Sequence, residues 1–262
     1  MKTVTAVFSV LLISIVLLLC GKIYAEAEFT FQNTSSFIDE SNIIHVYGEL
    51  KNLSSKAMKN VVIKASFYDM KGKLLNEFQR SSELRTINPG EISPFEILYI
   101  DTKTVKEVKN YSLTAVGTET QTKTKGLSIA SASGRLDLTG FYYINGKVIN
   151  QGEQTATNSL VIATLYDKEG RVIALGRAQT EPVNITSRSE APFGIAVTEK
   201  LQTYKAKRYS LLADSDQYVT IPDFSNLSMP LGLILGSVMI MNLIINKQKR
   251  ASHYLNRTSH SG

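Results

Sequence analysis

One strand–turn–strand pattern occurs twice in the chain, as ASFYDMKGKLL at residues 65–75 and as ATLYDKEGRVI at residues 163–173. In each copy, alternating apolar and polar residues lead into an Asp-x-x-Gly segment, Asp69 to Gly72 or Asp167 to Gly170. Asp accepts local backbone hydrogen bonds and Gly tolerates positive φ, so both segments indicate tight hairpin turns. The two hairpins therefore predict antiparallel β-structure.

The similarity extends on both sides of these hairpins at a constant offset of 98 residues, without a gap. It relates residues 28–122, the first repeat, to residues 126–220, the second repeat. A unit duplicated over about 95 residues predicts two successive domains of the same fold. The matched positions include Gly48 with Gly146, Asn52 with Asn150, Tyr68 with Tyr166, and Tyr111 with Tyr209.

Both repeats alternate apolar and polar residues with a period of two, in short runs about ten residues apart. This pattern predicts an all-β chain of two tandem immunoglobulin-like Greek-key β-sandwiches. Gly48 and Gly146 lie inside strands, where glycine suits a bulge or the close approach of another backbone. Tyr111 and Tyr209 are either tyrosine-corner residues or plain core aromatics. The short connector, residues 117–125, favours end-to-end stacking of the sandwiches as a rod.

The two quoted strings, each preceded by a Gly-x-x-x-Asn step and followed by Pro-Phe, resemble the FxLyD family. These are small immunoglobulin-like domains of prokaryotic surface and secreted proteins. Only Leu165-Tyr166-Asp167 matches the last three positions of the family motif directly, because Ala65 and Ala163 stand where it has Phe and Phe67 stands where it has Leu. The resemblance implies a fold and a cell-surface setting, and it transfers no catalytic residue.

Two apolar segments predict the membrane topology. Residues 1–25 have the pattern of a cleaved signal peptide, with an uncleaved anchor as the alternative. Residues 227–245 would extend about 28 Å as a helix, which suits a single transmembrane span. Lys247, Lys249 and Arg250 follow at once, so the positive-inside rule predicts a cytoplasmic tail at residues 246–262 and extracellular repeats.

Charge and cysteine content narrow the class of protein. The net charge of +6 comes from Lys and Arg residues that flank the two apolar segments, because residues 23–246 hold 23 basic and 23 acidic residues. A nucleic-acid-binding surface would need that excess within the folded region, so we expect no nucleic-acid partner. The only cysteine, Cys20, lies in the signal segment, so each repeat depends on its own apolar core. This favours a prokaryotic cell surface.

The sequence predicts no catalytic, cofactor or metal site. His45 is the one histidine before the membrane span, and its strand position is typical of a surface or half-packed residue. No zinc ligand set, Gly-x-Ser-x-Gly turn or phosphate-binding glycine loop is present. Turn chemistry accounts for Asp69 and Asp167. The Asp214-Ser-Asp216 segment is a weak calcium candidate, and a solvated loop is the simpler interpretation.

Asn-x-Ser/Thr sequons on the expected ectodomain mark four candidate N-glycosylation sites, at Asn33, Asn52, Asn110 and Asn184.

We therefore expect a single-pass cell-membrane protein that acts as a non-catalytic binding or scaffold protein. Its expected partners are the lipid bilayer and an unidentified envelope or membrane protein. The alternatives are a surface carbohydrate-binding module, which would use exposed aromatics such as Tyr99, Tyr142 and Tyr143, or an accessory subunit of a membrane enzyme complex.

Overall fold

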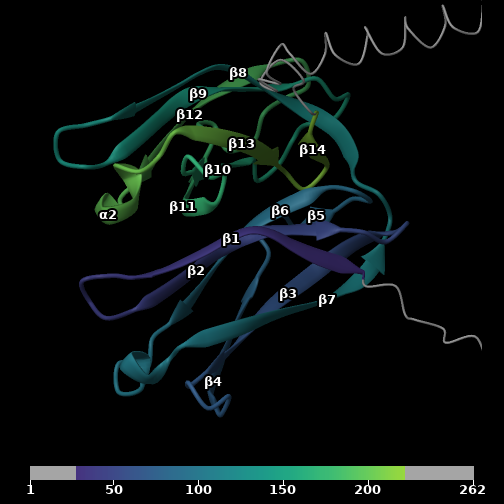
Figure 1. Cartoon of the computed structure of the whole chain (residues 1–262). Coiled ribbons are helices and arrows are strands. Elements are labelled where there is room, and N and C mark those ends of the chain that lie inside the picture. The colour runs from purple at the N-terminus through teal and green to yellow at the C-terminus, as the bar shows by residue number, and fades with distance from the viewer. Residues whose placement is uncertain (1–27, 222–262) are drawn as a thin grey trace, which may run out of the picture. The chain divides into compact units, whose positions relative to one another are not determined.

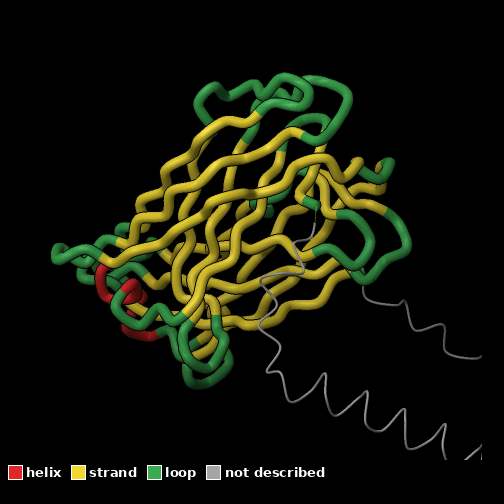
Figure 2. Tube along the Cα trace, turned by 90° about the horizontal axis from the view of Figure 1, so that it is seen from above, coloured by secondary structure: helices red, strands yellow, loops and turns green. Residues whose placement is uncertain are grey.

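A computed structural model describes residues 28–221 of the chain. This part is all-β, with packed sheets in a sandwich-like arrangement and only two short helical turns at one end (Figure 2). The predicted signal peptide, transmembrane helix and cytoplasmic tail lie outside the described residues. Within residues 28–221, no helix has both the length and the apolar character needed to cross a membrane.

The first repeat forms two facing sheets (Figure 1). One sheet has the order β1-β2-β6, and the other places β3 between β4 and β7, with the short β5 beside β3. The bounds are β1 Phe29–Ile38, β2 Ile44–Asn52, β3 Ala57–Tyr68, β4 Leu74–Ser81, β5 Thr86–Ile87, β6 Ile92–Tyr99, the 3-10 turn η1 Val105–Glu107, and β7 Asn110–Thr120.

The second repeat builds the same two layers but joins them. Its strands form one seven-stranded sheet in the order β11-β10-β13-β14-β8-β9-β12. The short β14 connects the layers because it pairs antiparallel with β13 and parallel with β8. The bounds are β8 Thr124–Leu136, β9 Tyr142–Asn150, β10 Leu160–Tyr166, β11 Val172–Gln179, β12 Glu190–Val197, α2 Lys200–Thr203, β13 Arg208–Asp214, and β14 Tyr218–Thr220.

The backbone follows the 98-residue offset in its unusual conformations as well as in its strands. β1 and β8 each carry a bulge at the same place, where Asn33 and Ser131 have φ of 53° and 54°. Gly90 and Arg188 take the same left-handed turn position, with φ of 75° and 61°. The backbone thus keeps a glycine-favouring conformation even where the second repeat has no glycine.

Each repeat contributes most of one apolar core, and Ile162 of the second repeat also packs into the core of the first. In the first core, Phe67 packs edge-on against Tyr99 with ring centroids 4.8 Å apart, and both side chains are fully buried. Within residues 28–221, every buried side-chain nitrogen and oxygen has a hydrogen-bond partner.

Gly48 and Gly146 make room for an aromatic ring. Each faces the bulge of the neighbouring strand and stands opposite Phe95 or Phe193 on the other side. A Cβ atom on Gly48 would lie 2.7 Å from Cζ of Phe95, and one on Gly146 would lie 2.8 Å from Cζ of Phe193. The close neighbour is therefore chiefly a phenylalanine ring, and the bulge lies in the adjacent strand.

Asn52 and Asn150 hold the end of their sandwiches in the same way. The side-chain amide of Asn52 donates to the carbonyls of Lys56 and Ile87, at 2.7 and 2.9 Å. The amide of Asn150 makes the matching bonds to Gln154 and Ile185. Both asparagines are fully buried, so their polar groups are used within the fold.

Replacing Arg188 by Gly should stabilise the protein. A non-glycine residue in the left-handed region costs about 1–2 kcal/mol, while glycine adds flexibility to the unfolded chain, so we expect a net gain of about 0.5–1 kcal/mol in the free energy of unfolding. Arg188 also pairs with Glu153, but both side chains are exposed and the pair contributes little. Chemical denaturation followed by tyrosine circular dichroism measures the change. The reverse substitution Gly90→Arg is the matched control and should destabilise; a stabilising effect there would contradict the explanation.

Candidate functional site

The outer face of the β1-β2-β6 sheet is covered by the second repeat. β11 lies against β1, β2 and β6 (Figure 1). Consequently His45, Tyr47 and Glu49, the outward-facing residues of β2, are only 6%, 1% and 7% exposed. The predicted end-to-end stacking is therefore wrong, because the repeats meet along the face of a sheet. We call this contact the junction.

An apolar cluster forms the centre of the junction. Tyr47 of the first repeat packs with Tyr166 and Val172 of the second, and Phe37 and Leu175 border them. The hydroxyl of Ser35 donates to the carbonyl of Val172 across the same contact.

His45 lies at one end of this cluster and is held by two carboxylates. Its Nδ1 is 2.9 Å from Oε1 of Glu96, and its Nε2 is 3.4 Å from Oδ2 of Asp39. The imidazole stacks on the ring of Phe37 with centroids 4.7 Å apart. The prediction of His45 as a surface or half-packed residue is therefore wrong. The imidazole is buried and bonded to two carboxylates, because the second repeat covers its face of the sheet.

The electrostatics favour a charged imidazole. Burial opposes the charge, but hydrogen bonds to Glu96 and Asp39 outweigh it and raise the pKa of His45. Burial likewise acts to raise the pKa of Glu96, yet hydrogen bonds from His45 and Tyr47 hold the pKa of that carboxyl below its usual value. Burial raises the pKa of nearby Glu199, which belongs to the second repeat.

A second set of polar contacts surrounds Glu49. Its carboxylate accepts hydrogen bonds from the hydroxyl of Tyr166 and from the side-chain amide of Asn33. The guanidinium of Arg208 lies 3.6 Å from the centre of the Tyr166 ring. Burial, together with the negative charge of Glu49, raises the pKa of Tyr166 to about 12.

The far end of the junction is an ion-pair anchor on Asp214, which is fully buried. Nζ of Lys123 lies 2.6 Å from its Oδ1, and the backbone N–H of Arg85 donates to its Oδ2 at 3.3 Å. Asp216 next to it pairs with Arg85 at 3.3 Å and accepts from Asn158. Cationic and amide groups of the chain itself thus occupy these carboxylates, which corrects both the calcium interpretation and the solvated-loop interpretation of Asp214. The sequence could not show that a connector lysine would reach Asp214.

Glu83 also links the two repeats. Its side chain is 5% exposed, and its Oε2 lies 3.1 Å from Arg177 of the second repeat. Burial raises the pKa of this carboxyl despite the arginines beside it.

A small cleft of about 200 Å³ opens beside the His45 end of the junction. Phe37, Asp39 and Glu199 line it, together with Glu40, Ser41, Thr198, Lys200 and Leu201. Among residues 28–221, no group of three or more His, Cys, Asp or Glu side chains is arranged to hold a metal ion.

The two Asp-x-x-Gly turns are held by their aspartates. Oδ1 of Asp69 accepts from the N–H groups of Lys71 and Lys73, and Gly72 has φ of 79°. Asp167 repeats these bonds toward residues 169 and 171, with Gly170 at φ of 82°. These two carboxylates stabilise the hairpin turns through hydrogen bonds to the backbone.

Tyrosines at equivalent positions play different parts in the two repeats. Tyr166 is buried at the junction, whereas the hydroxyl of its counterpart Tyr68 lies on an exposed surface near Ser112. Tyr111 and Tyr209 pack their rings against Phe67 and Tyr142, with centroids 6.1 and 6.2 Å apart. This packing fits the core-aromatic alternative.

Asn33, Asn110 and Asn184 are exposed. The amide nitrogen of Asn33, however, donates to Glu49 at the junction. Asn52 is fully buried and its amide nitrogen is already bonded twice, so we withdraw it as a glycosylation candidate. The sequence already indicated a structural role for Asn52, because the second repeat keeps an asparagine at the matching position, Asn150, without a sequon.

The aromatics proposed for carbohydrate binding are engaged within the fold. Tyr99 is fully buried in the first core. Tyr142 packs on Tyr209, and the guanidinium of Arg135 lies 5.8 Å from the centre of the Tyr143 ring.

No family model matches the chain, and no curated protein matches it. Among solved structures, an exo-chitosanase of Amycolatopsis orientalis is similar at 11% identity and a TM-score of 0.26, over 73% of this chain and 26% of that one. A β-glucuronidase of glycoside hydrolase family 2 gives 12% identity and 0.26, over 67% and 23%. Red sea bream transglutaminase gives 9% identity and 0.23, over 73% and 32%. The chain thus spans a third or less of these proteins, and likenesses this weak carry no argument about function.

Removing the carboxylate of Asp214 should destabilise the protein strongly. Asp214→Ala leaves the largely buried ammonium of Lys123 without its partner, which costs about 3–5 kcal/mol in the free energy of unfolding. Asp216→Ala is the matched control: its exposed pair with Arg85 should cost at most about 1 kcal/mol. Denaturant titration of the full chain measures both. Equal losses in the two variants would show that Asp214 is not an anchor.

The contribution of His45 to stability should depend on pH. Because its pKa is higher in the folded than in the unfolded protein, its stabilisation is complete below about pH 6.5 and is lost as the pH rises through the folded value. The difference in unfolding free energy between the natural chain and His45→Gln should therefore be larger at pH 6 than at pH 9. A difference that stays constant across this range would mean that the imidazole is neutral in the fold.

Proposed function

We propose that the chain is a membrane-anchored, outward-facing, non-catalytic binding or scaffold protein built from two tandem immunoglobulin-like Greek-key sandwiches of the FxLyD type. In this proposal residues 1–25 direct secretion, residues 227–245 form the single membrane span, and the partner is an envelope or membrane protein.

The observation that carries the proposal is that the ionisable groups of the junction are bonded to other groups of the chain itself. His45, the one imidazole among the described residues, has both nitrogens on carboxylates and its ring against Phe37. A general base needs a free nitrogen within reach of a substrate proton. These contacts support a structural role for His45 and a non-catalytic protein.

The junction also supports a presenting role. Separating the repeats would expose its apolar centre and leave Asp214, Glu49 and Glu83 without their partners in the other repeat or connector. Because unpaired buried charges are costly, the two repeats form one stiff body. A stiff body displays its edges to a partner in a fixed geometry.

Crosslinking in intact membranes tests the proposal. Amine-reactive crosslinking followed by affinity isolation of the full chain should capture a specific membrane or envelope protein, and fewer copies should be captured from Asp214→Ala because the junction is weakened. Absence of any specific partner would contradict the binding role.

A second assay addresses catalysis. The purified full chain and its His45→Ala variant should be equally inactive on chromogenic ester and glycoside substrates. A hydrolase activity that disappears in His45→Ala would overturn the non-catalytic assignment.

A further inference from the structure

The polar groups around His45 belong to a continuous series of charges. Oδ2 of Asp39 lies 3.4 Å from Nε2 of the imidazole, and Oε1 of Glu96 lies 2.9 Å from Nδ1. The other carboxylate oxygen of Glu96 lies 3.4 Å from Nη1 of Arg80. A negative group therefore stands on each side of the imidazole, and a positive group stands beyond Glu96.

The series continues across the junction. Arg80 lies 4.0 Å from Oε1 of Glu83, and Oε2 of Glu83 lies 3.1 Å from Arg177 of the second repeat. We call this set the charge series; its members, in order, are Asp39, His45, Glu96, Arg80, Glu83 and Arg177. The signs alternate along the whole series only while His45 carries a positive charge.

The geometry at His45 itself requires that charge. Each ring nitrogen faces a carboxylate oxygen, and an ionised carboxylate only accepts hydrogen bonds. A neutral imidazole has a single N–H, so either Asp39 or Glu96 would then face a nitrogen lone pair. Histidine is also the side chain whose ordinary pKa lies closest to neutral pH. One titration near neutral pH therefore breaks the charge series.

The other charged and titratable groups at this end of the junction come from every element around the imidazole. On β2 itself, the hydroxyl of Tyr47 lies 3.3 Å from Nδ1, and burial raises the pKa of this tyrosine, so it stays neutral. The groups from the other elements are Asp39 and Glu40 after β1, Arg80 of β4, Glu83 after β4, Glu96 of β6, Arg177 of β11, and Glu199 and Lys200 at the start of α2.

Glu199 is the carboxylate that the second repeat brings to this end. It lines the small cleft together with Asp39 and Phe37 of the first repeat. Burial raises the pKa of Glu199, the charge of His45 opposes this, and the charges of Glu96 and Asp39 add to it. Without the imidazole charge, two carboxylates of the first repeat would repel one carboxylate of the second. That repulsion acts across the junction.

The opposite end of the junction does not share this dependence on an imidazole. There the connector joins the repeats, and Nζ of Lys123 lies 2.6 Å from the carboxylate of Asp214. Figure 1 shows α2 and β14, which follows Asp214, at opposite ends of the second repeat. A carboxylate–ammonium pair contains no group that ordinarily titrates between pH 6 and pH 9. This anchor can therefore act as a hinge.

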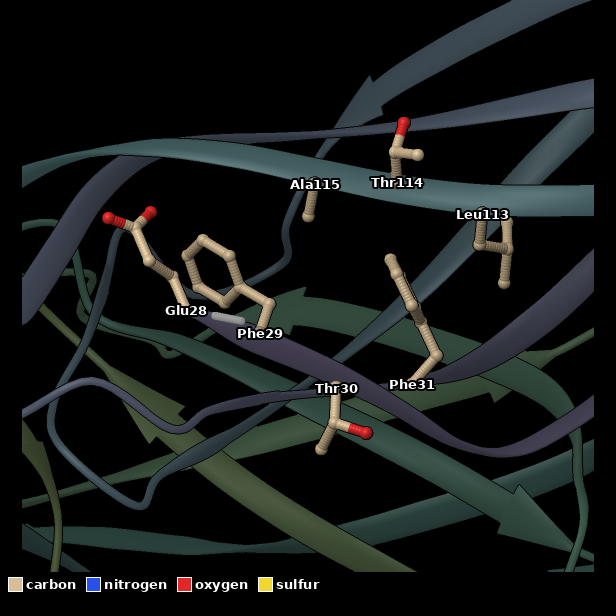
Figure 3. Close-up of a pocket in the computed structure, with 7 residues that line it drawn as sticks. All are labelled: Glu28, Phe29, Thr30, Phe31, Leu113, Thr114 and Ala115. Atoms are coloured by element: carbon tan, nitrogen blue, oxygen red, sulfur yellow. The ribbon is translucent and has the colours of Figure 1, made fainter. Parts of the chain in front are cut away.

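The apolar packing of β1 also allows opening at one end. Figure 3 shows Phe29 and Phe31 of β1 facing Leu113 and Ala115 of β7, so this part of β1 packs within the first repeat. Only the later part of β1, around Phe37, reaches the junction cluster. The second repeat can therefore move away from the β1–β2 turn while this packing of β1 stays in place.

We propose that His45 is a pH-sensitive latch: its charged imidazole holds the two repeats together at the α2 end, and loss of that charge lets them separate there about the Asp214 anchor. The inference goes beyond the proposed function, because it concerns the geometry of the two repeats and requires no partner.

A pair of nitroxide spin labels across the latch tests the inference in the full chain in detergent micelles. Ser41→Cys and Leu201→Cys place one label on each repeat at the exposed rim of the cleft, and Cys20→Ser removes the natural cysteine. Electron paramagnetic resonance should show one short label-to-label distance at pH 6. A longer distance should become about fivefold more populated by pH 9, reversibly. A distance distribution that does not change between these pH values overturns the inference.

Two variants assign the change to the latch. His45→Gln carries no charge, so the longer distance should be populated already at pH 6 and should not respond to pH. Glu199→Gln removes the carboxylate of the second repeat and should keep the short distance up to pH 9. Opening of His45→Gln with the midpoint of the natural chain overturns the inference. Should His45→Gln fail to fold, Glu199→Gln decides: undiminished opening at pH 9 in that variant overturns it.

Two further label pairs show where the chain moves. Ser41→Cys with Lys103→Cys reports on the first repeat alone, and Lys56→Cys with Asn184→Cys reports on the two repeats at the anchor end. Both distances should stay the same from pH 6 to pH 9. A change in the first pair would mean that the first repeat itself unfolds, and a change in the second would mean that the repeats separate completely. Either result contradicts a latch that opens about the anchor.

Discussion

The β1-β2-β6 sheet is covered on both faces, and the polar contacts of the junction are a consequence of this burial. A sheet with one face in solvent can carry any polar residue on that face. In a sheet covered on both sides, each polar side chain needs a hydrogen-bond or ion-pair partner. Glu49 meets Tyr166, His45 is held between Asp39 and Glu96, and the ring of Tyr47 joins the apolar centre. The charged groups at the junction are a consequence of this burial, and their partners come from either repeat according to where the second layer reaches.

The two repeats diverge mainly where this constraint acts on one of them. Inward-facing positions keep their character, as in Phe95 and Phe193 over their glycines. The outward positions of β2 change completely: His45 corresponds to Tyr143, and Glu49 to Lys147. Lys147 lies on a half-exposed strand and pairs with Glu190 on the same sheet. The second repeat therefore has a surface ion pair at the position where the first has a buried carboxylate.

Sequence periodicity predicted the all-β architecture because one face of each strand packs in its own repeat, and that face alone produces alternation. It predicted the hairpin turns at Asp69 and Asp167 because their chemistry is local. It misplaced His45 because the second repeat buries that face of the sheet. It misplaced Asp214 because the partner Lys123 is 91 residues away in the connector. One signal was available: the outer face of β2 carries Tyr47 where the same face of β9 carries the polar Asn145. The repeats also differ in one strand that the repeat pattern did not reveal, because β14 forms only in the second repeat.

The origin of that difference is a turn. In the second repeat, the chain leaves β13 after Asp214, and Ser215 closes a tight turn by bonding to both the N–H and the carbonyl of Tyr218. That turn sends β14 back along the sheet edge. The first repeat has Gly117 and Thr120 at the positions of Ser215 and Tyr218, and here β7 continues straight, pairing with β3 as far as Thr120. A straight β7 delivers the connector, and with it Lys123, to Asp214 of the other repeat. The same local change therefore anchors the junction: the segment that turns back as β14 in the second repeat runs on in the first and carries Lys123 to its buried carboxylate partner.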